Sequence, residues 1–107
     1  MTKERTRALN DALRTTFVGG KVTMTRTVER LPEQTVARAM LAVRAYSNFT
    51  ADNDPHGEHN FGRFSVDGVK FLFKIDYYDK DMNYGSDDPS DPAQTTRVLT
   101  LMLASDH

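Results

Sequence analysis

The chain has 107 residues, of which 38% are hydrophobic and 27% are charged; this composition is typical of one folded domain and not of a disordered segment. It contains no cysteine, which excludes a disulfide framework, a thiolate zinc site, an iron–sulfur cluster and a cysteine nucleophile. No stretch approaches the roughly 20 apolar residues of a membrane span, and the charged N-terminus lacks the apolar core of a signal peptide, so we expect a single cytoplasmic domain over residues 1–107.

The net charge is −1, but the charges are unevenly distributed along the chain. Residues 1–50 contain nine Lys and Arg against four acids, whereas residues 51–107 contain five against eleven. This division allows a dipolar surface that steers a charged partner, or two faces that are simply solvated.

The first predicted helix covers residues 2–17, because side chains of one stripe repeat there at three- and four-residue spacing. Lys3, Arg7 and Arg14 are expected to point away from this stripe. The glycine pair at residues 19–20 ends the helix, since glycine tolerates the left-handed conformation of a helix end. The stripe comprises Leu9, Ala12, Leu13, Thr16 and Phe17.

Residues 21–28 alternate between apolar side chains and threonine, which predicts a strand with one face in water. A second helix is predicted from Pro32 to about Ser47, since proline is favoured in the first turn of a helix. The apolar face of this helix comprises Val36, Ala39, Met40, Val43 and Tyr46. A polar stretch rich in turn-forming residues follows, over residues 50–58.

Asp67 and Gly68 stand between two alternating segments, which predicts a hairpin with a two-residue turn, because both positions of that turn require a positive φ. The flanking strands are predicted over residues 59–66 and 69–78. An acidic loop follows over residues 79–94. The dense apolar segment at residues 96–103 then predicts a strand that is covered on both faces.

The predicted order is therefore α-β-α-β-β-β. The economical way to bury these stripes is an α+β fold, in which two helices pack on one face of a mostly antiparallel four-stranded sheet. The strand edges that such a sheet leaves exposed are able to pair two copies, so a homodimer is compatible with the sequence.

Candidate chemistry concentrates in residues 52–62, DNDPHGEHNFG, where carboxylates and two histidines lie together. Imidazole and carboxylate are the usual ligands of divalent metals when thiols are absent. One interpretation is therefore a small metal-dependent hydrolase with one divalent ion as its cofactor. Its metal ligands would be Asp54, His56, His59 and Asp76, and its catalytic groups Glu58, His59 and Asp76.

The alternative interpretation of the same segment needs no cofactor and no catalysis. Asp and Asn side chains hydrogen-bond to the backbone of their own turns, Pro55 restricts φ, and Gly57 permits a bend before the next strand. On this interpretation the cluster is a structural turn.

Acidic residues also predict a binding surface in the second half of the chain. Between Asp52 and Asp91 there are ten acids and only four Lys and Arg. Held on a rigid sheet and a loop that contains prolines, these charges can imitate nucleic-acid phosphate to a basic protein, or they can simply keep the chain soluble. The predicted partner-binding residues are Asp52, Asp79, Asp81, Asp87, Asp88 and Asp91.

Nucleic-acid binding by the first helix is a further interpretation, because this helix carries Lys3, Arg5, Arg7 and Arg14. The domain is not basic overall, so a solvated helix face explains these residues more simply.

Four motifs occur in order along the chain: NDPHGEHNFG at residues 53–62, KIDYYD at 74–79, SDDPSDP at 86–92 and TRVLTLMLA at 96–104. Together they resemble a family of small bacterial proteins catalogued only as a domain of unknown function, numbered three-seven-six-eight. The family often has an aromatic residue in place of His56, an aspartate in place of Asn60 and a tryptophan in place of Phe73. The charged positions that match its pattern are Asp54, Glu58, His59, Asp76, Asp79 and Arg97.

This resemblance implies no reaction. Proteins of this kind are often carried on plasmids and other mobile elements among antirestriction and transfer functions, which implies by association a role in the contest between mobile DNA and host defence. We therefore expect a non-enzymatic interaction module, an anti-defence inhibitor of the anti-CRISPR or antirestriction type. Its expected partner is a bacterial protein with a basic, nucleic-acid-binding surface.

Overall fold

The structure is a computed structural model that describes residues 2–107. Helix α1 (Thr2–Thr16) begins the fold and ends where Phe17 adopts a left-handed φ of 60°, so that Phe17 and not the glycine pair takes the conformation that ends the helix. The backbone N–H of Phe17 donates a 2.7 Å hydrogen bond to the carbonyl of Leu13. The predicted helix is confirmed to within one residue.

Strand β1 (Lys21–Met24) is shorter than the predicted strand, because the chain turns into a short helix, α2 (Arg26–Glu29). Val28 is fully buried on this helix. The hydroxyls of Thr25 and Thr27 both donate to the carboxylate of Asp106 near the other end of the chain. The threonines expected on the wet face of a strand therefore bind the C-terminal segment.

The remaining elements are α3 (Glu33–Ala45), β2 (Phe61–Val66), β3 (Val69–Tyr78), β4 (Thr96–Leu103) and a short 3₁₀ helix, η1 (Ala104–Asp106). The hairpin turn is confirmed, with φ values of 52° at Asp67 and 78° at Gly68. β3 and β4 have the predicted bounds.

The strands form one four-stranded sheet in the order β1-β4-β3-β2. The pairs β2–β3 and β3–β4 are antiparallel, but β1 pairs with β4 in parallel, with Lys21 opposite Val98. The α+β class and the four strands are confirmed, whereas the sheet is mixed and α2 changes the order to α-β-α-α-β-β-β. β4 lies between β3 and β1 and runs antiparallel to β3. Because β1 runs in the same direction as β4, these two strands form the parallel pair.

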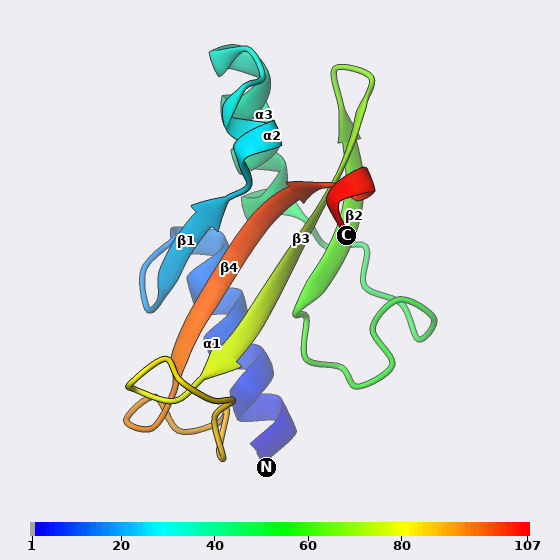
Figure 1. Ribbon diagram of the computed structural model, residues 1–107. Coiled ribbons are helices and arrows are strands. Elements are labelled where there is room, and N and C mark those ends of the chain that lie inside the picture. The colour runs from blue at the N-terminus through cyan, green and yellow to red at the C-terminus, as the bar shows by residue number, and fades with distance from the viewer. Residues whose placement is uncertain (1) are drawn as a thin grey trace.

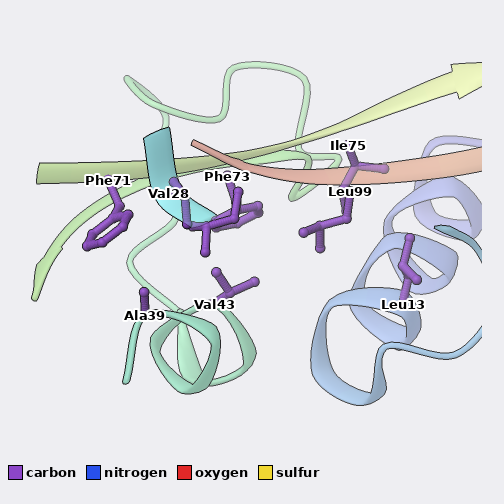
Figure 2. Close-up of a cluster of buried hydrophobic side chains, with 9 residues drawn as sticks. Leu13, Val28, Ala39, Val43, Phe71, Phe73, Ile75 and Leu99 are labelled. Carbon is purple, nitrogen blue, oxygen red and sulfur yellow. The ribbon is translucent and has the colours of Figure 1, made fainter. Parts of the chain in front are cut away.

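Helices α1 and α3 cover one face of the sheet, behind the strands in Figure 1. Figure 2 shows the side chains of the sheet pointing toward these helices, with Leu13 from α1 and Val43 from α3 opposite them. Full burial of a Val, Leu, Ile or Phe side chain stabilises a fold by about 1.5–3 kcal/mol. The buried cluster comprises Leu13, Val28, Ala39, Val43, Phe71, Phe73, Ile75, Leu99 and Leu101.

The opposite face of the sheet is covered only at one end. Leu72 and Met102 are buried where η1 turns back toward β3 (Figure 1). Val98 and Thr100, on the same face of β4, remain partly exposed. The prediction that β4 is covered on both faces is therefore wrong for most of its length. Within residues 2–107, no helix is both long enough and apolar enough to cross a membrane.

Gly62 marks the closest packing between β2 and its neighbours. A Cβ atom at this position would lie 2.5 Å from Cε2 of Phe73 and 2.7 Å from the ring of Tyr46. These two rings pack edge to face with centroids 5.4 Å apart. Only glycine therefore lets both rings lie against the strand that follows the DNDPHGEHN segment.

Candidate functional site

A buried polar network lies where α1 crosses the end of the sheet. Asn10 is fully buried in the middle of α1. Its Oδ1 accepts a 2.9 Å hydrogen bond from Nε of Arg97 on β4, and its Nδ2 donates to the hydroxyl of Tyr77 (2.7 Å) and to the carbonyl of Glu58 (3.0 Å). One amide thus joins the first helix, the two central strands and the loop before β2.

Tyr77 connects this network to the carboxylate of Glu58. Its hydroxyl donates a 2.6 Å hydrogen bond to Oε1 of Glu58. Burial raises the pKa of Tyr77, and the neighbouring Glu58 carboxylate raises it further, so the phenol keeps its proton and acts as a donor. Burial lowers the pKa of Arg97, while electrostatic interactions with Tyr77 and Glu58 oppose that shift.

Asp54 and His59 form the second part of the cluster. The Asp54 carboxylate accepts hydrogen bonds from the backbone N–H groups of Glu58 (3.1 Å) and His59 (3.2 Å). His59 has a positive φ of 56°, and its Nδ1 lies 2.9 Å from Oδ1 of Asp11 while its Nε2 lies 3.7 Å from Oδ2 of Asp54. Its ring stacks on Phe49 at 3.9 Å. Asp54 therefore closes a turn, and His59 fastens that turn to α1.

Arg14 lies inside the protein, so the prediction that it points away from the core is wrong. It is 5% exposed, and its Nη1 donates to the carbonyls of Val43 (3.2 Å) and Tyr46 (2.7 Å) at the end of α3. Its Nη2 donates a 3.0 Å hydrogen bond to Asp11. A buried cation at the carbonyl end of a helix is favoured by the helix dipole and by these acceptors. The sequence signal was available in Asn10 and Arg14, which are polar side chains four residues apart beside Leu13.

A polar cleft of about 460 Å³ opens beside this network, between the start of α1 and two loops. Glu58 and Pro89 both line the cleft and contact the buried network: the Glu58 carboxylate accepts from the hydroxyl of Tyr77, and the carbonyl of Pro89 accepts from Nη2 of Arg97. The lining residues are Thr2, Lys3, Thr6, Pro55, His56, Glu58, Asp87, Asp88, Pro89 and Ser90.

The four residues suggested as metal ligands do not converge. Asp54 and His59 approach each other, but His56 lines the cleft beside Glu58. Asp76 lies on the opposite face of the sheet from Tyr77, where it forms a 2.7 Å ion pair with Lys74. Throughout residues 2–107, no three His, Asp or Glu side chains are placed to hold one metal ion.

The three residues suggested as catalytic are also dispersed. Glu58 and His59 are neighbours in the chain, yet Glu58 binds Tyr77 and His59 lies against Asp11. Asp76 faces away from both. The arrangement matches the structural-turn interpretation of this segment, in which the polar groups bind one another and the backbone.

Three of the six acids suggested for partner binding stabilise their own loop. Asp79 accepts a hydrogen bond from the N–H of Asn83, Asp88 accepts from the N–H and hydroxyl of Ser90, and Asp91 accepts from the N–H of Ala93. The other three, Asp52, Asp81 and Asp87, are exposed. Asp52 lies in the loop before β2, drawn to the right of that strand in Figure 1, whereas the other five acids lie in the loop after β3.

The basic residues of α1 are used within the fold. Nε of Arg5 donates a 2.8 Å hydrogen bond to the carbonyl of Ser90, and Nη1 of Arg7 donates a 3.2 Å hydrogen bond to the carbonyl of Gly57. Hydrogen bonds from Gln94 and Ala93 lower the pKa of Asp91, and the charge of Arg5 contributes to the shift. The positive first half and the negative second half therefore meet at this end of the molecule.

The segment between β3 and Ser86 forms a braced loop with two uncovered apolar side chains. Asp79 N–H donates to the carbonyl of Tyr84 (2.8 Å), and Ser86 N–H donates to that of Tyr77 (3.1 Å). Tyr84 is nevertheless 77% exposed, and Met82, which has a positive φ of 61°, is 39% exposed. Exposed Asp81 directly precedes Met82 in the chain. Sequence reasoning identified the acids of this loop but not Met82 or Tyr84.

Residues 24–106 match the family described as "Protein of unknown function (DUF3768)", which covers more than half of the chain. Neither the curated proteins nor the solved structures contain a match to the chain. The matched range contains Glu58, His59 and Arg97, whose side chains join the loop before β2 and strand β4 to Tyr77 and to Asp11 and Asn10 of α1. The chain belongs to the DUF3768 family.

Proposed function

We propose that this protein is a non-enzymatic interaction module that binds a basic bacterial protein through the acidic loop between β3 and β4. The partner class that we propose is a nucleic-acid-binding protein of a host defence system, acting in the cytoplasm. Proteins that bind nucleic acid carry basic surfaces, and an acidic loop complements such a surface.

The braced loop is the observation that carries this proposal. Tyr84 is 77% exposed although the backbone around it is fixed by hydrogen bonds. Tyrosine is enriched among the residues that dominate binding energy at interfaces, and a rigid backbone lowers the entropy lost on binding. The exposed carboxylates of Asp81 and Asp87 flank this anchor in the chain and supply the charge.

The hydrolase and the nucleic-acid interpretations have less support. The suggested catalytic and metal-binding residues point to different faces, as described above. Arg5 and Arg7 already donate to backbone carbonyls of the loops, so phosphate would compete with internal hydrogen bonds. Protein binding at the acidic loop needs no rearrangement of either group.

The test compares the wild-type chain with Asp81→Lys/Asp87→Lys and with Tyr84→Ala. Asp81 and Asp87 are chosen because Asp79, Asp88 and Asp91 stabilise turns, so reversing those charges would also lower the melting temperature. The matched control is Glu4→Lys/Ala12→Lys/Thr23→Lys, which changes the net charge equally at exposed positions outside the acidic loop and α3.

Each chain is immobilised and incubated with bacterial lysate, and binding is then measured with the purified captured protein. In a second assay, each chain is expressed in cells that restrict incoming plasmids. We expect wild type and control to bind the same protein and to protect the plasmid. The two loop variants should lose both effects with unchanged melting temperatures. Equal binding and protection by all chains would contradict the proposal.

A further inference from the structure

Helix α3 leaves a row of apolar side chains uncovered on the side away from the sheet. Ala37, Leu41 and Ala45 are all exposed, and they repeat at four-residue spacing, which places them on one side of the helix. Leu41 is 61% exposed, although leucine is a residue that normally contributes to a core. The sequence pattern of α3 is thus apolar on two sides, of which the fold covers one.

An apolar groove begins one turn away from Leu41. It has a volume of about 320 Å³ and lies between α2 and the start of α3, with Ala37 at its edge. Its lining includes the apolar residues Leu31 and Val36 and the acidic residues Glu29 and Glu33. Exposed Leu41 and this apolar groove therefore lie next to each other along α3, since Ala37 lines the groove one turn before Leu41.

From this juxtaposition we propose that two copies of the chain associate through α3, with Leu41 of each copy inserted in the groove of the other. A surface that carries both a projection and a matching groove is complementary to itself, which is the requirement for a two-fold symmetric interface. When two α3 helices run antiparallel and Leu41 faces Ala37 of the second copy, position 33 of one helix comes close to position 44 of the other.

The charges on α3 suit this arrangement. Glu33 is exposed in the first turn and Arg44 is exposed in the last. The guanidinium of Arg44 is anchored, since its Nε donates a 2.9 Å hydrogen bond to the carbonyl of Thr15 and its Cζ lies 5.7 Å from the ring centre of Phe17. Antiparallel helices bring opposite charges together at both ends of the contact, whereas parallel helices would oppose like charges. The strand edges of the sheet take no part in this interface.

Sedimentation equilibrium of the full chain tests the proposal, at protein concentrations up to about 1 mM so that a Kd in the millimolar range is detected. We expect a reversible monomer–dimer equilibrium for wild type and a loss of association of at least about 30-fold for Leu41→Lys, because a charge cannot enter an apolar groove. The control is Tyr84→Lys, which changes a more exposed side chain on the distant loop and should leave association unchanged. Melting temperatures establish that each variant is folded.

Cross-linking then identifies the surface, and the absence of cysteine from the chain makes single-cysteine variants free of background. Under mild oxidation, Ala37→Cys mixed with Leu41→Cys should form mainly the mixed disulfide dimer, while Asn83→Cys should form none. A wild-type chain that remains monomeric at all concentrations would overturn the proposal and leave the face to another protein. Equal weakening by Leu41→Lys and Tyr84→Lys, or random cross-linking, would overturn it too. None of these three outcomes bears on partner binding by the acidic loop.

Discussion

Asn10 and Arg97 lie 87 positions apart in the sequence, yet Oδ1 of Asn10 accepts a 2.9 Å hydrogen bond from Nε of Arg97 inside the protein. Through the two hydrogen bonds of its Nδ2, the same amide also holds Tyr77 and the backbone of Glu58. The loop before β2, which lies within the residues matched by the family, is therefore held by a helix residue that precedes the matched segment.

Replacing Asn10 by alanine should be severely destabilising. The substitution leaves the Nε of Arg97 and the carbonyl of Glu58 without their partners in the interior, and each such loss costs about 1–3 kcal/mol. We expect the free energy of unfolding in urea to fall by about 3 kcal/mol. Asn48→Ala, at an exposed position in the loop after α3, is the control and should change it by less than about 0.5 kcal/mol. Similar values for the two variants would show that the network contributes little.

Tyr77→Phe should change how stability depends on alkaline pH. Because burial raises the pKa of Tyr77, the folded state keeps the phenol proton at a pH where the unfolded chain has released it. The resulting stability is present below the unfolded pKa of about 10 and is lost as the pH rises beyond it. Tyr77→Phe should therefore be less stable than wild type at pH 7 and lose less stability above about pH 10. Parallel curves of unfolding free energy against pH would contradict this assignment.

Asp67→Asn should show the opposite pH dependence. The hydroxyl of Thr35 donates a 2.8 Å hydrogen bond that lowers the pKa of Asp67, and Arg38 lowers it further. The stability gained is present above the unfolded pKa of about 3.9 and disappears as the pH falls through the lowered pKa of the folded state. The difference in melting temperature between wild type and Asp67→Asn should therefore shrink below about pH 4. Thr35→Val should reproduce much of this effect, and a difference independent of pH would argue against it.

Gly62→Ala should be destabilising by about 1–3 kcal/mol, because the new methyl group would overlap the rings of Phe73 and Tyr46. Gly85→Ala is the matched control, since a Cβ there meets only the carbonyl of Tyr77, at 3.8 Å. The free energies of unfolding of both variants, measured by chemical denaturation, test this prediction. A neutral Gly62→Ala would mean that the two rings move aside at little cost.

Features set by neighbouring residues could be predicted from the sequence. The Asp67-Gly68 turn and the alternation of β3 are local, so the hairpin turn and the bounds of β3 were correctly anticipated. The parallel pairing of Lys21 with Val98 depends on contacts far apart in the chain, and no local pattern encodes it. The sheet was therefore predicted in strand number but not in topology.

The candidate site was predicted in composition but not in arrangement. Charged residues were expected at the surface, but Arg14 is buried. Its burial is favourable because the carbonyl groups at the end of α3 accept its hydrogen bonds, and the sequence alone does not show that these groups lie beside it. The positive φ of His59 sends its ring toward Asp11 while Glu58 turns to Tyr77. Adjacent residues in a motif therefore serve two different contacts.

The central position of β4 has a consequence for synthesis of the chain on the ribosome. β1 is complete early, but its partner strand is translated much later, since Lys21 pairs with Val98 77 positions downstream. At about 5–20 residues per second, β1 waits some 4–15 s for β4. During that interval the nascent chain lacks the strand that joins β1 to β3, and both strands have unpaired edges that attract other chains or chaperones. A translation arrest before residue 96 therefore releases a chain without the middle of its sheet.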